Sequence, residues 1–456
     1  MAILQNFADD SILVKKTKIS QEEMAQKAKI LIDDFERKTI EREEVVRLVV
    51  LSFMSSKHMF LIGKPGVGKT FMLEKLKYIL KEGFCFEYLL MKDTKTSELF
   101  GRTREDSDGN IIHDRERSVV NANIIILDEM FKASAELLNG FLGIFSQNRN
   151  FFLERVGEVS VPLISGYAAS NEFPQDDILA PFDDRFHFRY EVKRIENIDN
   201  FRRYITGDFD KSNDFGASFS YHELVALRDK FKKVYFPEDI LDKYMDLKNN
   251  IIRQDLSVSD RKFSDATEIF KASAYLNNRQ SVSYSDIFLL LHIGWKDFIE
   301  RDRLKEVMFN TFFSKKDDMV KRFIDIKEGY SKLISMCETH VIPFISEKII
   351  FNFEEVEECI NYNNYVDFFI GRLEDFEYLK NSLFIIEENY NFTLFVEEDI
   401  RENIFLIDYV NETFSEEFLE EFFSFKEKFI EVHKYYFSFA LDKGKKIKID
   451  KELLGE

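Results

Sequence analysis

The sequence predicts an α/β protein in which a parallel sheet flanked by helices is followed by a helical domain and a mainly helical C-terminal region. Short apolar runs alternate with amphipathic stretches up to about residue 195, helical periodicity alone continues to about residue 299, and the last third is rich in phenylalanine and glutamate. We therefore expect four parts: a tail at 1–20, an α/β domain at 21–195, a helical domain at 196–299 and the C-terminal region at 300–456.

The α/β part begins with two expected helices, at 21–38 and 41–56, in which apolar residues recur every three or four positions. Five apolar runs bounded by turn residues then predict the strands of a five-stranded sheet. Strands that alternate with helices form a parallel sheet covered on both faces. The expected strands lie at 58–63, 84–91, 123–128, 161–170 and 186–192, and helical stretches between them include 69–82 and 133–148.

Two polar segments interrupt this alternation, at 102–118 and 150–163. Each contains turn residues, such as Asp106 to Gly109 in the first, so we expect two hairpins. After the last strand, capping residues and helical periodicity predict a run of helices. These lie at about 197–206, 220–234, 238–254, 260–277 and 284–299, and more helices follow from 300 to 345.

Charge and cysteine content narrow the functional classes. The chain of 456 residues has a net charge of −19, and residues 347–441 alone hold 23 acidic against 7 basic residues. A surface of that sign repels phosphate backbones, which disfavours sequence-independent nucleic-acid binding. Three cysteines without CxxC spacing suggest neither a disulfide framework nor a zinc site. With no signal-peptide pattern and no apolar run of about 18 residues, we expect a cytoplasmic protein without a membrane span.

A phosphate-binding loop is the strongest motif in the chain. The run matches GxxxxGK[ST] and lies between an expected strand and an expected helix, where backbone N–H groups can surround phosphate oxygens. Lys69 would bridge the β- and γ-phosphates, and the Thr70 hydroxyl would ligate Mg²⁺. The expected nucleotide-binding residues are Gly63, Lys64, Pro65, Gly66, Val67, Gly68, Lys69, Thr70 and Phe71.

Two further strand ends carry polar residues suited to this chemistry. The apolar run at 124–127 ends in Asp128 and Glu129, which predicts Asp128 as the Mg²⁺-holding acid on a neighbouring strand and Glu129 as the general base. Asn171 follows the next expected strand and can hydrogen-bond the γ-phosphate or the attacking water. The alternatives are two solvated acids for the first pair and a turn-starting Asn for the second.

Two arginines are candidates for completing the site. Arg185 follows Asp183 and Asp184, and its natural role is to reach the nucleotide of a neighbouring subunit, where a guanidinium neutralises charge on the transferring phosphoryl group. The alternative is an ion pair with one of those aspartates. Arg261 opens a later helix and can close over the nucleotide like a lid, or be an exposed first-turn arginine.

The order GKPGVGKT, IIILDE, AASN, DRF and SDR, followed by helices, resembles the AAA+ ATPases and, within them, the MoxR family. The stretches at 86–101, 127–148, 168–174 and 258–279 are similar to its RavA branch, and the similarity covers about residues 21–299. It implies an AAA+ module with a helical lid. It also implies that the two hairpins match segments that reach into a ring pore, although two exposed hairpins without substrate contact are the alternative.

The resemblance assigns roles to matched positions: Lys69 and Thr70 to Walker A, Asp128 and Glu129 to Walker B, Asn171 to sensor 1, Arg185 to the arginine finger and Arg261 to sensor 2. Arg189 lies close enough in sequence to be confused with the finger. The family implies ATP with Mg²⁺, a homo-oligomeric and typically hexameric ring, and a protein partner that often bears a von Willebrand A domain.

The C-terminal region leaves two interpretations open. Residues 347–441 hold 24 Phe or Tyr residues, which recur at helical spacing in 416–439, so packed amphipathic helices are expected. An acidic, aromatic docking surface for a partner is the second interpretation, and both can hold. For the whole chain we expect a chaperone-like ATPase that remodels a protein. A nucleic-acid motor, for example in phage defence, is the alternative, because arginines cluster in and near the hairpins; a non-hydrolysing scaffold is least favoured.

Overall fold

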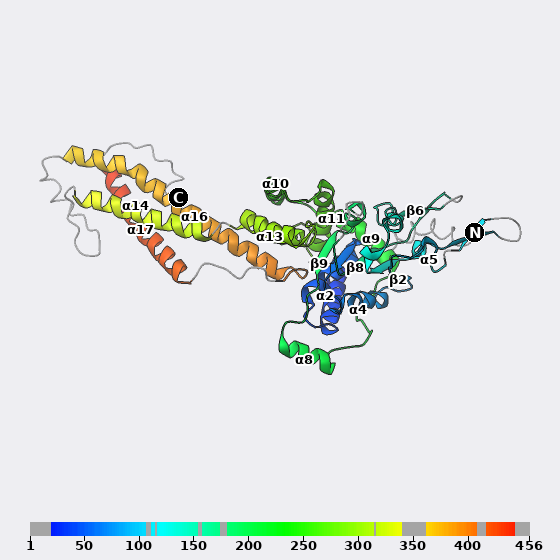
Figure 1. Cartoon of the computed structure of the whole chain (residues 1–456). Coiled ribbons are helices and arrows are strands. Elements are labelled where there is room, and N and C mark those ends of the chain that lie inside the picture. The colour runs from blue at the N-terminus through cyan, green and yellow to red at the C-terminus, as the bar shows by residue number, and fades with distance from the viewer. Residues whose placement is uncertain are drawn as a thin grey trace. The chain divides into compact units, whose positions relative to one another are not determined.

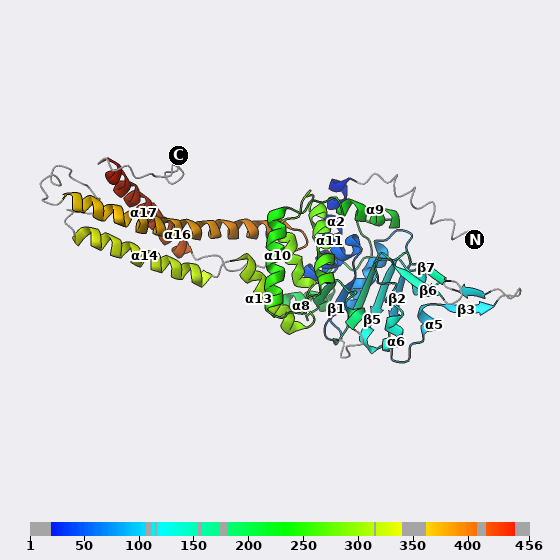
Figure 2. The ribbon, with the colours of Figure 1, turned by 90° about the horizontal axis from the view of Figure 1, so that it is seen from above.

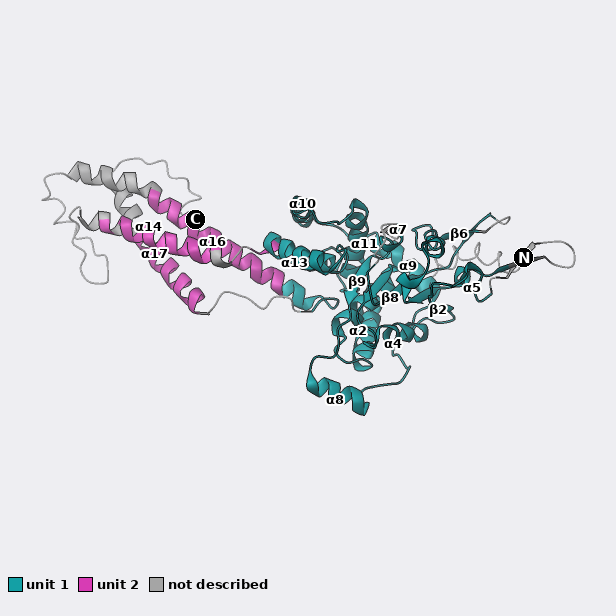
Figure 3. Ribbon diagram, in the orientation of Figure 1, with its two compact units in different colours: residues 1–311, 398–409 teal, residues 312–397, 410–456 magenta. Residues whose placement is uncertain are grey.

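The computed structural model describes residues 20–105, 111–114, 116–153, 157–173, 180–313, 316–339, 362–407 and 416–442. The expected N-terminal tail, the turn at Asp106 to Gly109 and the end of the chain beyond residue 442 lie outside the described residues. The chain divides into two compact units (Figures 1 and 3). Unit 1 comprises residues 1–311 and 398–409, and unit 2 comprises residues 312–397 and 410–456.

Unit 1 is built on a five-stranded parallel sheet, as the sequence predicts (Figure 2). Its order is β2 (Cys85–Leu89), β5 (Ile124–Asp128), β8 (Ser165–Ser170), β1 (Met59–Ile62) and β9 (Phe188–Glu191). All residues of β1 and β8 are buried, as expected for strands covered on both faces. The expectation that β5 neighbours β1 is wrong, because β8 pairs with both and lies between them.

The first two helices form close to where the periodicity predicts them. Helix α2 (Gln21–Arg37) begins at Ser20, whose side chain accepts a hydrogen bond from Glu23 N, and α3 (Glu43–Ser55) follows it. A Ser side chain at this position satisfies one of the four unpaired N–H groups of a helix start. Helix α3 is buried from Val45 to Ser55 apart from one position, Arg47, so it packs into the centre of the unit.

Two other helices are shorter than the sequence predicts. The stretch 69–82 forms α4 (Lys69–Glu74) and a 3₁₀ turn, η1 (Lys75–Tyr78), because Leu80 then makes a β-bridge with Phe219 that a helix would prevent. The stretch 133–148 forms only α6 (Ala135–Asn139), followed by turns with hydrogen bonds between residues three apart. Gly140 and Gly143 lie in those turns, and glycine weakens a helix interior.

Both expected hairpins are present. The first pairs β3 (Arg102–Glu105) with β4 (Ile111–Asp114), and the second pairs β6 (Asn150–Leu153) with β7 (Gly157–Ser160). They extend from the same side of unit 1 (Figures 1 and 2). Phe100, two residues before β3, stacks on Phe151 of β6 with ring centroids 4.8 Å apart, so the bases of the two hairpins are in contact.

The helical domain of unit 1 contains α8 (Ile198–Thr206), α9 (Tyr221–Phe231), α10 (Glu238–Arg253) and α11 (Asp260–Leu276). The expected helix at 284–299 is wrong. That stretch forms α12 (Tyr284–Ile287) and the 3₁₀ helix η5 (Phe288–His292), and α13 (Phe298–Phe312) begins only after a break. Trp295 is buried in this break, and its indole N–H donates to Leu291 O at 2.9 Å, so tertiary packing overrides helical periodicity.

Residues 398–407, which we call the return segment, also belong to unit 1. Asn403 is 2% exposed, and its amide group donates to Ser273, Ser285 and Asp286. The Asp399 carboxylate accepts a hydrogen bond from Ser285 N at 2.7 Å. The backbone of Leu406 accepts a further bond from Arg47 of α3. The return segment is therefore fixed to helices that lie more than a hundred residues earlier in the chain.

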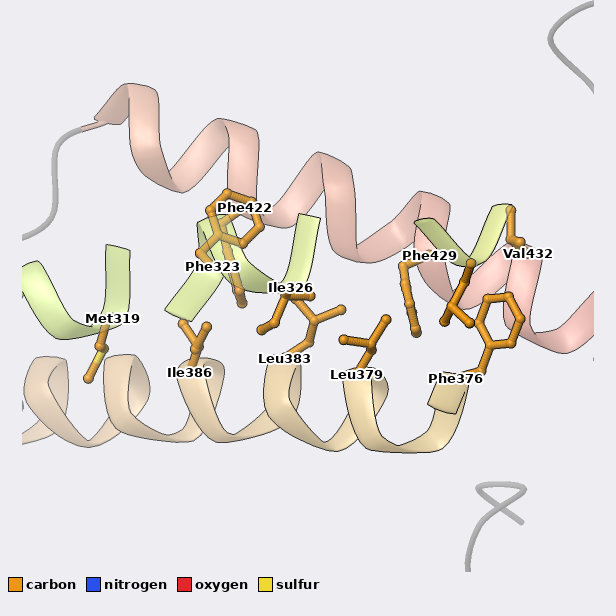
Figure 4. Packing of buried hydrophobic residues seen from close by; sticks show 11 residues of the cluster. Met319, Phe323, Ile326, Phe376, Leu379, Leu383, Ile386, Phe422, Phe429 and Val432 are labelled. Carbon is orange, nitrogen blue, oxygen red and sulfur yellow. The ribbon is translucent and has the colours of Figure 1, made fainter. Parts of the chain in front are cut away.

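Unit 2 consists, in its described part, of α14 (Lys316–Thr339), α16 (Tyr362–Glu402) up to residue 397, and α17 (Glu416–Asp442). Eleven buried apolar side chains from the three helices form its core (Figure 4). They are Met319, Phe323, Ile326, Leu333, Phe376, Leu379, Leu383, Ile386, Phe422, Phe429 and Val432. The expectation of packed amphipathic helices is thereby confirmed. Among the described helices, none is long and apolar enough to cross a membrane.

Candidate functional site

The phosphate-binding loop lies between β1 and α4, at the edge where the carboxyl ends of the parallel strands meet. Glycine is needed for steric reasons at two positions of this loop. A Cβ on Gly63 would lie 2.4 Å from Val192 O, and Gly68 has φ of +85°, a left-handed conformation that side chains disfavour. The sequence after Ile62 therefore curls tightly and directs Lys69 and Thr70 into the start of α4.

Lys69 is the centre of a polar cluster at this edge. Its ammonium group donates to Asn171 Oδ1 at 2.7 Å and to Gly63 O at 2.6 Å. Asn171 Nδ2 donates in turn to Glu129 Oε1 at 2.6 Å. Burial lowers the pKa of Lys69, and the carboxylates of Glu129 and Asp128 offset part of that shift. Three residues that the sequence singled out on three separate elements are thus joined by direct hydrogen bonds.

A second pair in the cluster fits Mg²⁺. Thr70 Oγ1 donates to Asp128 Oδ2 at 2.7 Å, so a hydroxyl and a carboxylate oxygen from α4 and β5 lie side by side. Mg²⁺ prefers such oxygen ligands and usually keeps several of its waters, so two protein ligands are enough. Among the described residues there is no group of three or more His, Cys, Asp or Glu side chains that could hold a metal. The Thr70 and Asp128 oxygens are of the kind that suits the ion.

Glu129 has a backbone conformation that is uncommon for a residue with a side chain. Its φ is +52°, and its N–H donates to Asp128 Oδ1 at 2.9 Å. Residues held in the left-handed region cluster at functional sites, where the surrounding structure keeps them there. Here the turn directs the Glu129 carboxylate toward Asn171 on one side and Lys132 Nζ, at 3.3 Å, on the other.

A pocket of about 850 Å³ adjoins the loop, within the size range of small-molecule sites. The loop contributes Pro65 to Gly68 and Phe71 to its lining. The opposite walls come from residues that the sequence reading missed: Lys38, Thr39, Ile40, Arg42, Arg194, Ile195, Phe201, Tyr204, Ile205, Phe209 and Lys211. For the wall residues Lys38 to Arg42, the polar break at 38–42 between two expected helices was a signal in the sequence. The aromatic side chains near α8 gave no comparable signal.

Arg42 connects this wall to the loop itself. Its guanidinium donates to Val67 O at 3.0 Å and to Lys193 O at 2.9 Å. One side chain therefore connects the phosphate-binding loop, the segment between α2 and α3, and the chain after β9. The burial that accompanies these contacts lowers the pKa of Arg42.

Arg185 and Arg261 lie elsewhere in unit 1. Arg185 precedes β9, whose first residue pairs with the first residue of β1, so it lies at the amino-end edge of the sheet. A four-residue strand spans about 13 Å, which separates this edge from the phosphate-binding loop. Arg261 lies beside it, 3.9 Å from Asp184 and 3.6 Å from Asp265. The structure brings the two arginines together but does not bring Arg261 to the loop of its own chain.

Arg189 differs clearly from Arg185. It is 1% exposed and forms an ion pair with Asp183 at 2.5 Å. Arg185 is only partly buried, and burial together with the nearby Arg261 lowers its pKa. The buried ion pair that the sequence left open for Arg185 is thus made by Arg189, and Arg185 is left near the surface.

Comparison with known proteins places these features in context. Residues 26–212 match the family model described as the MoxR domain in the MoxR-vWA-beta-propeller ternary systems, and residues 239–308 match the AAA lid domain. The uncharacterized protein MJ0079 of Methanocaldococcus jannaschii is 28% identical over 368 residues, which are 73% of this chain and 95% of that protein. The uncharacterized protein MJ0812 of the same organism is 28% identical over 262 residues, 57% of this chain and 68% of that protein.

A solved structure described as a "putative ATPase" from Cytophaga hutchinsonii superposes with a TM-score of 0.51 at 17% sequence identity. The superposition covers 64% of this chain and 94% of that chain. At this identity the likeness shows the fold alone.

Proposed function

We propose that this chain binds ATP with Mg²⁺ and hydrolyses it. The AAA+ fold and the matches to the MoxR domain and the AAA lid domain support an ATPase of the MoxR family. The observation that carries the proposal is the hydrogen-bonded cluster of Lys69, Asn171 and Glu129 beside the Thr70–Asp128 pair. It assembles a phosphate-binding cation, a water-positioning amide and a carboxylate base from three elements.

The proposed roles follow from the chemistry of each group. Backbone N–H groups of the loop bind the phosphates, and Lys69 neutralises charge on the terminal phosphoryl group. Thr70 and Asp128 would hold Mg²⁺, which supplies further charge neutralisation when bound. Asn171 orients the attacking water toward Glu129, which accepts its proton. The aromatic side chains beside α8 would contact the base in the adjoining pocket.

The position of Arg185 supports an assembly of several copies. A guanidinium at the amino-end edge of the sheet cannot serve the loop at the carboxyl-end edge of the same sheet, so it would act on a neighbour's nucleotide. We propose the same direction for Arg261, because Asp184 and Asp265 keep it beside Arg185. A closed ring, hexameric as in related ATPases, lets each copy both give and receive these arginines.

We further propose a protein substrate, with a von Willebrand A domain protein as the partner. The matched family model is named for systems that contain such a domain. The two joined hairpins offer a contact surface, on which Phe152 is 74% exposed. We further propose that the chain belongs to the RavA-like branch, that it remodels its partner in a chaperone-like way and that it acts in the cytoplasm. Co-purification of the chain with von Willebrand A proteins encoded beside it, in the presence of ATP, tests the partner.

The alternative of a nucleic-acid motor has less support. Arg149, one of the clustered arginines, is directed inward and donates to Ser56 O at 2.8 Å and Ile164 O at 3.0 Å. These contacts fix Arg149 to the interior of unit 1, so it does not belong to a basic surface on the hairpins. Steeply salt-dependent nucleic-acid binding, without capture of a protein partner, would favour the alternative.

Replacement of Glu129 by Gln tests the ATPase proposal. The amide cannot accept a proton but keeps the size of the side chain, so we expect ATP to bind normally and turnover to fall by about 100-fold or more. Lys69→Ala is the matched comparison and should lose ATP binding itself. Equilibrium binding of a fluorescent ATP analogue and phosphate release measure the two effects separately. Undiminished phosphate release by Glu129→Gln would rule out the base assignment.

A further inference from the structure

A second cavity lies at the amino-end edge of the sheet, opposite the phosphate-binding loop. It has a volume of about 460 Å³. Its lining comes from the residues before β1 and β9, including His58 and His187, from the turns after α6, and from α9 and α11. All of these elements belong to unit 1.

The lining is strongly cationic. It contains one carboxylate, Glu268, and six basic side chains: Lys57, Arg149, Arg228, Lys232, Arg261 and Lys271. The whole chain, in contrast, has a net charge of −19. A concentration of one sign in a concave site raises the local concentration of ions of the other sign. A cavity of this composition is therefore suited to an anion.

Part of this positive charge is not neutralised by the protein. Lys57 pairs with Glu268 at 2.7 Å, Arg261 with Asp265 at 3.6 Å, and Lys232 with Asp229 at 3.2 Å. Among the described residues, Arg149, Arg228 and Lys271 have no carboxylate within 4.0 Å. These three side chains leave a net positive charge on the cavity wall.

Two of them, Arg149 and Arg228, are half-buried and lie near one another. Among the described residues, the Arg149 guanidinium donates only to backbone carbonyl groups, and its pKa is lowered well below the ordinary value by burial and by the charge of Arg228. The Arg228 Nε is buried without a hydrogen-bond partner among the described residues. A buried donor without a partner is costly, and two like charges repel, so an anion would relieve both.

The remaining walls are uncharged and partly aromatic. Burial lowers the pKa of His187 to about 4 and that of His58 well below its ordinary value, so both imidazoles are neutral at pH 7. Phe145 and Phe231 are the aromatic part of the lining, and the uncharged polar part is Ser55, Ser56, Ser146, Gln147 and Thr267. Arginine matches phosphate geometry with paired N–H donors, whereas aromatic walls suit the flat part of an organic molecule.

We infer that this cavity binds a phosphate-bearing small molecule, at a site separate from the phosphate-binding loop. The cavity and the pocket beside the loop lie at opposite edges of the sheet and share no lining residue. Arg261 lines the cavity and is also the arginine proposed above to act on a neighbour's nucleotide, so the test is made with the loop disabled. Inorganic pyrophosphate and a nucleoside monophosphate present the same chemistry, and the experiment below distinguishes them.

The test uses the full chain with Lys69→Ala, in which the loop is disabled, and excludes divalent cations. Calorimetry measures the binding of pyrophosphate, AMP and adenosine. We expect pyrophosphate and AMP to bind and adenosine not to bind. If AMP binds more tightly than pyrophosphate, the ligand is a nucleotide; in the reverse order, it is an inorganic or simpler phosphate.

Substitutions then locate the binding. In the Lys69→Ala background, Arg228→Gln should weaken pyrophosphate binding by about tenfold or more, and Lys232→Gln and Lys271→Gln by severalfold each. Lys233→Gln is the matched control, because Lys233 is exposed, adjacent in sequence and outside the lining. Melting curves confirm that each variant is folded.

Three results would overturn the inference. The first is that pyrophosphate and AMP both fail to bind the Lys69→Ala chain. The second is that Lys233→Gln weakens binding as much as Lys232→Gln, because the effect would then be general surface charge. The third is that polyglutamate binds in a manner sensitive to Arg228→Gln whereas phosphates do not, which would assign the cavity to an acidic peptide.

Discussion

At the scale of single residues, Arg189 and Arg185 should affect different properties. Replacing Arg189 should lower the stability of the fold, and replacing Arg185 should lower the rate of ATP turnover. Arg189→Ala leaves Asp183 without its buried partner, and breaking such a pair costs about 3–5 kcal/mol, so we expect a clear loss of unfolding free energy in denaturant. Arg185→Ala should leave the melting temperature nearly unchanged and reduce ATP turnover by roughly 1,000-fold, as for other arginines that act across subunits. A reversal of these two effects would exchange the roles assigned to the two side chains.

His187 supplies a pH-dependent part of the stability. Its pKa is about 4 in the folded chain because of burial, against about 6.5 when unfolded. As pH falls below about 6.5, the unfolded chain takes up a proton that the folded chain does not, so stability present above that pH is lost down to pH 4. The loss from His187 alone is up to about 3 kcal/mol.

Melting temperatures at pH 7 and pH 5 measure this dependence. His187→Gln keeps a polar side chain without a titrating group, so the difference between the two temperatures should shrink in that variant. An equally large difference in the variant would show that other groups, such as His58, account for the pH dependence.

Residues of the site were predictable from sequence to different degrees. Lys69, Thr70, Asp128, Glu129 and Asn171 each occupy a fixed place relative to a strand end, and parallel strands bring their carboxyl ends to one edge. Local pattern therefore sufficed for them. The polar break at 38–42 placed Arg42 between two helices, but neither Arg42 nor Tyr204 could be assigned to a pocket wall, because the segments that form the wall meet only through tertiary packing.

At the scale of elements, strands were easier to predict than helices. A buried strand is set by a short apolar run, whereas α4 and α6 end early because of a bridge to Phe219 and of glycine-containing turns. The return segment was not foreseen at all. Its residues lie in the acidic, aromatic region, and nothing in their order shows that Asn403 binds side chains near residue 280.

The return segment gives a prediction at this scale. Asn403→Ala removes donors to Ser285 and to Asp286, a fully buried carboxylate, so we expect a loss of about 1–3 kcal/mol in the stability of unit 1. Hydrogen exchange should be faster at α12 and at the C-terminal end of α11. The adjacent Glu402→Ala is the control, because Glu402 is exposed, and equal effects of the two variants would contradict the role of Asn403.

At the scale of the whole molecule, two units with separate cores should respond separately to core mutations. Phe422 is 1% exposed in the core of unit 2, whereas the adjacent Phe423 is 37% exposed. We expect Phe422→Ala to destabilise unit 2 by about 3–5 kcal/mol and Phe423→Ala by much less. Denaturant unfolding followed by circular dichroism, together with ATP binding as a probe of unit 1, measures both parts. Loss of ATP binding at the same denaturant concentration as unit 2 unfolding would show a single cooperative unit.

The path of the chain between the units has a practical consequence. It leaves unit 1 near residue 311, comes back at 398 and leaves again after 409, so three connections join the two bodies. A shortened polypeptide that stops at 311 would lack the return segment, which makes hydrogen bonds to Asp286 and Arg47. The surfaces that this segment covers would then be exposed, and we expect the shortened polypeptide to aggregate. By the same reasoning, a single protease cut at one connection leaves both fragments held together, and they should elute as one species until denaturant is added.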